Sequence, residues 1–137
     1  MTADELARGY FIRARKRLEA LRTLMAVEAY PDVVREAQEL VELVLKGMLR
    51  WVGVDPPKWH DVGSILIEEQ AKFSPQIRER IPELAEISLR LRREREIAFY
   101  GDRDLIPERL YDRAAAARAL ADAERTIEAI GYFIGPG

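Results

Sequence analysis

Hydrophobic residues recur along most of the chain at intervals of three and four positions, which is the spacing of one face of an α-helix. This pattern predicts a first helix over residues 3–27, and Thr2 followed by Glu5 is typical of an N-terminal capping box. It predicts a second helix over residues 31–52, where Pro31 suits the first turn. The apolar face of this second helix is wide enough for the central helix of a bundle.

Three further helices and one short helical turn are predicted in the rest of the chain. A shorter helix covers residues 62–72, and a turn of helix from Pro75 leads to Pro82, which is predicted to open a long helix ending at Phe99. The last helix is predicted over residues 107–130. Its apolar stripe consists of Leu110, Ala114, Ala117, Leu120 and Ile127. No segment alternates like a strand, and short links favour antiparallel neighbours. We therefore expect an all-α fold, an up-and-down antiparallel four-helix bundle with a shorter fifth helix.

The length suits a single domain over residues 1–137. A composition of 48% apolar and 34% charged residues is typical of a globular protein. The chain has no cysteine, which excludes disulfides and thiolate ligands and fits a reducing cytosol. No apolar run approaches the roughly 20 residues that cross a bilayer. Asp4 and Glu5 stand where a signal peptide would be basic. We therefore expect a cytoplasmic protein without membrane contact.

The charge is nearly balanced but unevenly composed. The net charge of −2 argues against indiscriminate binding of nucleic acid over the whole surface. Of the 22 basic residues, 18 are arginines, whose planar guanidinium suits carboxylates and phosphates. A GC-rich genome or a surface rich in ion pairs explains the same arginine count.

The run RREREIAFYGD, residues 92–102, interrupts the apolar face of the fourth predicted helix. That face consists of Leu84, Ile87, Leu91 and Ala98. Glu94 and Arg95 stand where the same face should continue. An unpaired buried charge is costly, so we expect these groups to be paired, solvated in a cleft, or at a subunit contact. The alternative is a fraying helix end, where arginines favour the negative end of the helix dipole. Gly101 suits the turn that follows the helix.

The single histidine of the chain lies in the segment WHD, just before the third predicted helix. Asp61 is suited to cap that helix, and this gives His60 a structural place beside the cap. The opposing hypothesis pairs His60 with Asp61 for acid–base chemistry. One histidine without cysteines argues against a metal site, and no glycine-rich phosphate loop occurs. We expect neither a metal nor a cofactor.

Two segments carry a family resemblance, WHDVGSIL at the third helix and REREIAFYGD at the end of the fourth. With them, the helical plan of nearly the whole chain resembles the HEPN domains, small all-helical proteins of prokaryotes. The resemblance implies a homodimer in which a signature Arg and His from each subunit meet in a cleft. Ribonuclease members cut RNA there without a metal. Many members pair with a minimal nucleotidyltransferase in toxin–antitoxin systems, and others bind nucleotides or are inactive partners.

The chain departs from that signature at Tyr100, which stands where the family has its histidine after Arg95 or Arg93. A tyrosine hydroxyl, with a pKa of about 10 against about 6.5 for histidine, is a poor general base near neutral pH. It can still donate a hydrogen bond to phosphate or stack on a base. The resemblance therefore leaves Arg95 and Tyr100 as the candidate catalytic pair, and it leaves the enzyme question open.

The expected function is a homodimeric module with an arginine-lined cleft that binds a nucleotide or RNA phosphate. As the resemblance implies, its partner would be a minimal nucleotidyltransferase in a toxin–antitoxin-type system. The candidate phosphate- or nucleotide-binding residues are Arg92, Arg93, Arg95, Tyr100, Asp102 and His60. The alternative is a metal-independent endoribonuclease, a toxin that uses Arg95 with Tyr100 or His60. A purely structural oligomeric scaffold is the third reading.

Overall fold

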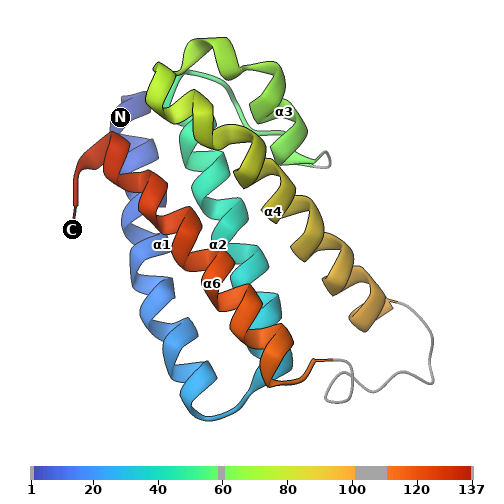
Figure 1. Cartoon of the computed structure of the whole chain (residues 1–137). Coiled ribbons are helices and arrows are strands. Elements are labelled where there is room, and N and C mark those ends of the chain that lie inside the picture. The colour runs from blue at the N-terminus through green and yellow to red at the C-terminus, as the bar shows by residue number, and fades with distance from the viewer. Residues whose placement is uncertain (1, 59–60, 101–110, 137) are drawn as a thin grey trace.

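The computed structural model describes residues 2–58, 61–100 and 111–136, and for residues 95–100 it describes the backbone alone. Over this part of the chain the structure consists of five α-helices and one 3₁₀ turn, without a strand. The long helices α1, α2, α4 and α6 alternate in direction, and the short α3 lies near one end of the bundle (Figure 1). The predicted all-α bundle with a shorter fifth helix is confirmed.

Helices α1 and α2 form an antiparallel pair whose bounds agree with the prediction to within a residue. Helix α1 spans Ala3–Ala26 and begins with the predicted capping box. The Thr2 hydroxyl accepts a hydrogen bond from the Glu5 amide at 3.1 Å, and the Glu5 carboxylate accepts one from the Thr2 amide at 3.1 Å. Helix α2 spans Tyr30–Trp51, with Pro31 in its first turn. Eleven of its residues are buried, which makes it the central helix of the bundle.

The third predicted helix is divided into two parts. Helix α3 spans Val62–Glu68, and a 3₁₀ turn follows at Gln70–Lys72. Asp61 caps α3 as predicted, because its carboxylate accepts a hydrogen bond from the Gly63 amide at 3.0 Å. A Cβ atom on Gly63 would lie 3.0 Å from the Cα atom of Ala85. The absence of a side chain at this position therefore lets α3 pack directly on the backbone of α4.

The predicted break at Pro82 is wrong, because α4 is one continuous helix over Pro75–Tyr100. A proline inside a helix removes the hydrogen bond to the carbonyl four residues earlier, here that of Arg78. Both Arg78 and Pro82 are exposed, so water can bind the freed carbonyl. Ile81 and Leu84, on either side of the proline, are fully buried in the same core. Their burial favours continuation of the helix across Pro82.

Helix α6 spans Arg113–Ile134 and corrects the last predicted helix at both ends. The predicted start at residue 107 lies outside the described residues, but residues 111–112 are not helical. Asp112 caps the helix instead, since its carboxylate accepts a hydrogen bond from the Ala115 amide at 2.9 Å. The helix also continues four residues beyond the predicted end at Ile130.

The predicted apolar stripe of α6 is also wrong in its phase. Ala114 and Ala117 are exposed, and Leu120 and Ile127 are only partly buried; Leu110 lies outside the described residues. The face that enters the core consists of Ala115, Ala116, Ala119, Ala123, Thr126, Ala129 and Ile130. The five alanines of this face let α6 pack closely against α1 and α2.

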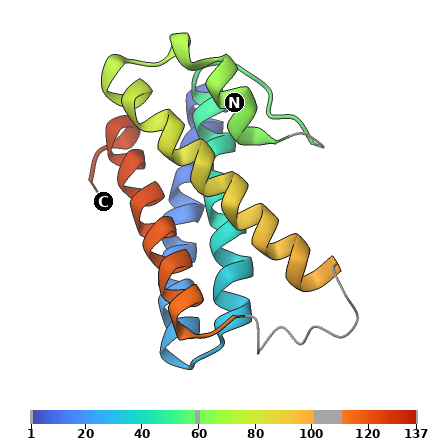
Figure 2. The same ribbon diagram turned by 45° about the vertical axis from the view of Figure 1, so that its right-hand side comes forward.

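The last turns of α4 leave the bundle. Figures 1 and 2 both show the C-terminal half of α4 diverging from α2 and α6. Leu91 is the last residue of α4 that is described as buried in the core. The charged run that begins at residue 92 therefore starts where α4 separates from its neighbours.

Within the described chain, no helix is long and apolar enough to cross a bilayer.

Candidate functional site

Arg92 faces α2 from the point where α4 leaves the core. Its guanidinium Nη2 lies 2.8 Å from Oε1 of Glu42, with the two side chains 28% and 20% exposed. Partial burial reduces solvent screening, so the pair links α4 to α2 more firmly than a fully exposed pair would. The predicted binding residue Arg92 therefore already has a carboxylate partner.

Arg93, one position further, is exposed and has a different environment. It makes no ion pair with any described residue, whereas Arg90, on the same helix, lies 2.6 Å from a carboxylate oxygen of Asp122 on α6. A hollow of about 300 Å³ is lined by Glu86, Leu89, Arg90, Arg93 and Glu94. Arg93 is therefore the cation of this hollow that has no ion-pair partner among the described residues.

Glu94 is half-buried on the side of α4 that faces α6. Burial raises the pKa of its carboxyl above the ordinary value; Arg118 and Arg90 act in the opposite direction, and Asp122 adds to the increase. The Tyr111 hydroxyl donates a hydrogen bond to the backbone carbonyl of Glu94. Burial and the Glu94 charge raise the pKa of Tyr111 to about 12, so the hydroxyl keeps its proton at neutral pH. This bond joins α4 to the residue just before the cap of α6.

Four of the predicted site residues cannot be placed in this arrangement. Arg95 and Tyr100 belong to α4, but only their backbone is described. Asp102 and His60 lie outside the described residues. Because α4 continues to Tyr100, positions 95 and 100 lie about 140° apart around the helix axis. Asp61, the expected neighbour of His60, uses its carboxylate to cap α3.

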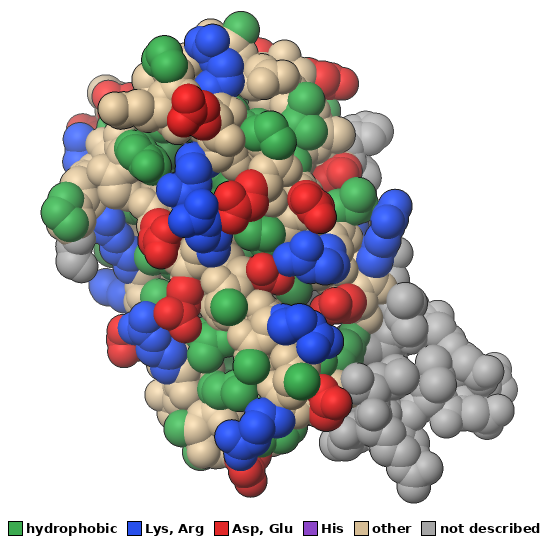
Figure 3. Space-filling view, viewed as in Figure 1, with side chains coloured by type: hydrophobic (Ala, Val, Ile, Leu, Met, Phe, Trp, Pro, Cys, Tyr) green, Lys and Arg blue, Asp and Glu red, His purple; other side chains and the backbone are tan. Residues whose placement is uncertain are grey.

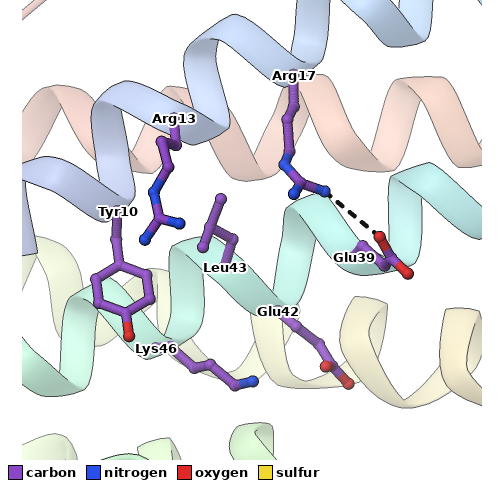
Figure 4. A pocket seen from close by; sticks show the side chains of 7 residues that line it. All are labelled: Tyr10, Arg13, Arg17, Glu39, Glu42, Leu43 and Lys46. Atoms are coloured by element: carbon purple, nitrogen blue, oxygen red, sulfur yellow. Dashed lines mark hydrogen bonds and ion pairs between the residues drawn. The ribbon is translucent and has the colours of Figure 1, made fainter.

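A second charged site lies between α1 and α2, and the sequence reasoning missed it. Its cavity has a volume of about 280 Å³. We call it the α1–α2 groove, and Figure 4 shows the residues that line it, Tyr10, Arg13, Arg17, Glu39, Glu42, Leu43 and Lys46. Their intervals of three and four positions show that the residues of each helix share one face, but not that the two faces meet. Glu42, the partner of Arg92, connects the groove to α4.

The face shown in Figure 3 is covered by alternating charges and carries no continuous basic patch. Arg125 on α6 illustrates the pattern, because it bonds Glu83 on α4 at 2.7 Å and Glu128 on its own helix at 3.0 Å. Such exposed pairs contribute little individually to stability. Among the described residues, no group of His, Cys, Asp and Glu is arranged to hold a metal ion.

Comparison with known proteins identifies one family. The family model described as HEPN domain matches residues 7–131, which include the α1–α2 groove and all of α4. Neither the comparison with curated proteins nor that with solved structures gives a match. Because the family match covers nearly the whole chain, the protein belongs to the HEPN domain family.

Proposed function

We propose that this protein is a homodimeric module that binds a nucleotide or RNA phosphate at the end of α4. The proposal includes a minimal nucleotidyltransferase as its partner, in a toxin–antitoxin-type system. Membership of the HEPN domain family supports both parts. The chemistry of the α4 end supports the first part, since guanidinium groups form charge-assisted, bidentate hydrogen bonds with phosphate.

The observation that carries the proposal is the state of Arg93. Its side chain is exposed, it lines a hollow beside Leu89, and no described carboxylate pairs with it. The neighbouring cations Arg90 and Arg92 are each bound to a carboxylate of another helix. These pairs hold α4 in place, and among the described residues Arg90, Arg92 and Arg93, Arg93 remains open to a ligand.

Binding of RNA tests the proposal directly. We expect a labelled single-stranded RNA to bind the protein, with a dissociation constant that increases about tenfold in Arg93→Gln, the loss of one charge-assisted contact. Lys58→Gln removes one positive charge from an exposed position outside this hollow and is the matched control. Fluorescence anisotropy at two salt concentrations measures the RNA affinity of both variants. Equal affinity of wild type and Arg93→Gln would contradict the proposal.

The second candidate function, a metal-independent endoribonuclease, is favoured by one backbone observation. Positions 95 and 100 both lie in the last turns of α4 and keep the signature spacing, although they are about 140° apart around the helix axis. The same RNA incubated with a chelator distinguishes the two functions. Cleavage that is lost in both Arg95→Ala and Tyr100→Phe would establish the enzyme. Binding without cleavage would establish the binding module.

A further inference from the structure

The α1–α2 groove brings cations from two helices to one cavity. Arg13 and Arg17 extend from α1, Lys46 extends from α2, and Leu43 lies between them (Figure 4). The groove has polar and apolar walls together, as ligand pockets generally do. Its volume of about 280 Å³ is close to the lower end of the range for small-molecule pockets, about 300–1,000 Å³. The size suits one small ligand.

The carboxylates of the groove are already engaged. Glu39 lies 3.4 Å from Nη1 of Arg17, and Glu42 lies 2.8 Å from Nη2 of Arg92. Arg13 and Lys46, by contrast, form no ion pair with the part of the chain that the structure describes. Lys46 is partly buried and Arg13 is exposed. Arg13 and Lys46 are therefore the two cations of the groove without a described carboxylate partner, and both can bind a phosphate group.

The wall of the groove beside these charges is aromatic. The guanidinium carbon of Arg13 lies 5.1 Å from the centre of the Tyr10 ring, in a cation–π arrangement. Aromatic rings and guanidinium planes are the surfaces on which proteins stack nucleobases. The groove thus combines a stacking surface with two cations that have no described counter-charge.

We propose that the α1–α2 groove binds a nucleotide. Arg13 and Lys46 hold the phosphate, and the base lies against the Tyr10–Arg13 wall. The ligand class rests on the proposed function, but the location is separate from Arg93. The Glu42–Arg92 pair connects the two places, because Glu42 lines the groove and Arg92 belongs to α4.

Calorimetric titration of the full chain with AMP tests the groove. We expect AMP to bind wild type and to bind Lys46→Gln and Arg13→Gln about tenfold more weakly or worse. Lys58→Gln carries the same chemical change outside the groove and should match wild type. Thermal unfolding of each variant shows whether it is folded, and the exposed Arg13 provides a variant that leaves the core untouched.

A second titration, with single-stranded RNA of about ten nucleotides, identifies the source of the nucleotide. If the affinity for RNA depends on Lys46, the groove takes a nucleotide of a strand. If the affinity for AMP depends on Lys46 and the affinity for RNA does not, the groove takes a free nucleotide. Both outcomes support the groove. Absence of binding by both probes, or equal binding to wild type and both groove variants, would overturn it.

The two proposals can fail separately. RNA binding that requires Arg93 but is unchanged in Lys46→Gln and Arg13→Gln, with no AMP binding, refutes the groove and leaves the α4 proposal standing. RNA binding that requires Lys46 but is unchanged in Arg93→Gln refutes the α4 site and supports the groove.

Discussion

At the scale of single residues, the run that begins at Arg92 contains three neighbours with three different environments. Arg92 is bound to Glu42 on α2, Arg93 is exposed, and Glu94 is half-buried towards α6. The helical repeat turns each residue by about 100° from the one before, so adjacent charges face different neighbours. The chemistry of this segment therefore depends on phase around the helix more than on its total charge.

Glu94 should make stability depend on pH. Its pKa is raised in the folded protein above the ordinary 4.5, mainly by burial. Between the unfolded and the folded pKa, the Glu94 carboxyl is protonated in the folded state and ionised in the unfolded state. The free energy of unfolding therefore falls as pH rises through this range. We expect Glu94→Gln to have a higher free energy of unfolding than wild type near neutral pH. This difference should shrink in acid, below both pKa values.

Urea unfolding at several pH values measures this difference. Glu79→Gln, at an exposed position of the same helix, is the control for the loss of one negative charge. A difference between Glu94→Gln and wild type that stays constant from neutral pH to acid would contradict the raised pKa.

At the scale of helices, local signals predicted the starts of α1, α2 and α3 correctly. The capping box at Thr2, the proline at Pro31 and the cap at Asp61 act within one turn, so the local sequence contains their physics. Pro82 failed as a signal because burial on both sides of it outweighs one lost hydrogen bond. The phase of α6 failed because its alanines occur on every side, and small side chains become core or surface according to their neighbours.

The contact between α1 and α2 depends on Gly47. A Cβ atom there would lie 2.7 Å from Cε1 of Phe11, and Phe11 is fully buried against Trp51 and Phe133. We expect Gly47→Ala to destabilise the protein by about 1–3 kcal/mol, the usual cost of an overpacked core. Urea or thermal unfolding measures the change.

Gly9 provides the matched substitution on α1. It is exposed, and a Cβ atom there would meet nothing within 4 Å. Alanine is the better helix former, so Gly9→Ala should stabilise by up to about 1 kcal/mol. If Gly47→Ala also stabilises the protein, α1 and α2 do not approach each other as closely at Gly47 as described.

The candidate site was predictable only in part, because contacts between helices depend on packing that the local sequence does not contain. The interruption of the apolar face at Glu94 could be read from helical periodicity, and the structure does place this carboxyl half-buried. The α1–α2 groove could not, because it requires Arg13 and Lys46 to meet across two helices. The Arg92–Glu42 pair, 50 positions apart, likewise depends on how the helices pack. Sequence patterns identify which face of a helix is unusual, and packing decides what that face meets.

At the scale of the whole molecule, the proposed homodimer would place a second copy of the chain against the half of α4 that diverges from the bundle. Both views show the C-terminal half of α4 separating from α2 and α6 (Figures 1 and 2). In the proposed homodimer this half contacts the partner, and each subunit contributes its α4 end to a shared cleft.

Sedimentation should therefore give about twice the chain mass of 15.7 kDa at a protein concentration of roughly 50 μM. The fraction of dimer should decrease on dilution by mass action. Equilibrium ultracentrifugation over a range of concentrations measures this. A monomer at every concentration would exclude the shared cleft.

Two of the ion pairs that attach α4 to its neighbours also restrict how the protein can evolve. Arg92 meets Glu42 on α2, and Arg90 meets Asp122 on α6. Reversing the charge of one member alone places two like charges against each other, whereas exchanging both restores the attraction. Charge reversals at these positions should therefore occur in compensating pairs. Positions 92 and 42, and positions 90 and 122, should covary among homologous proteins.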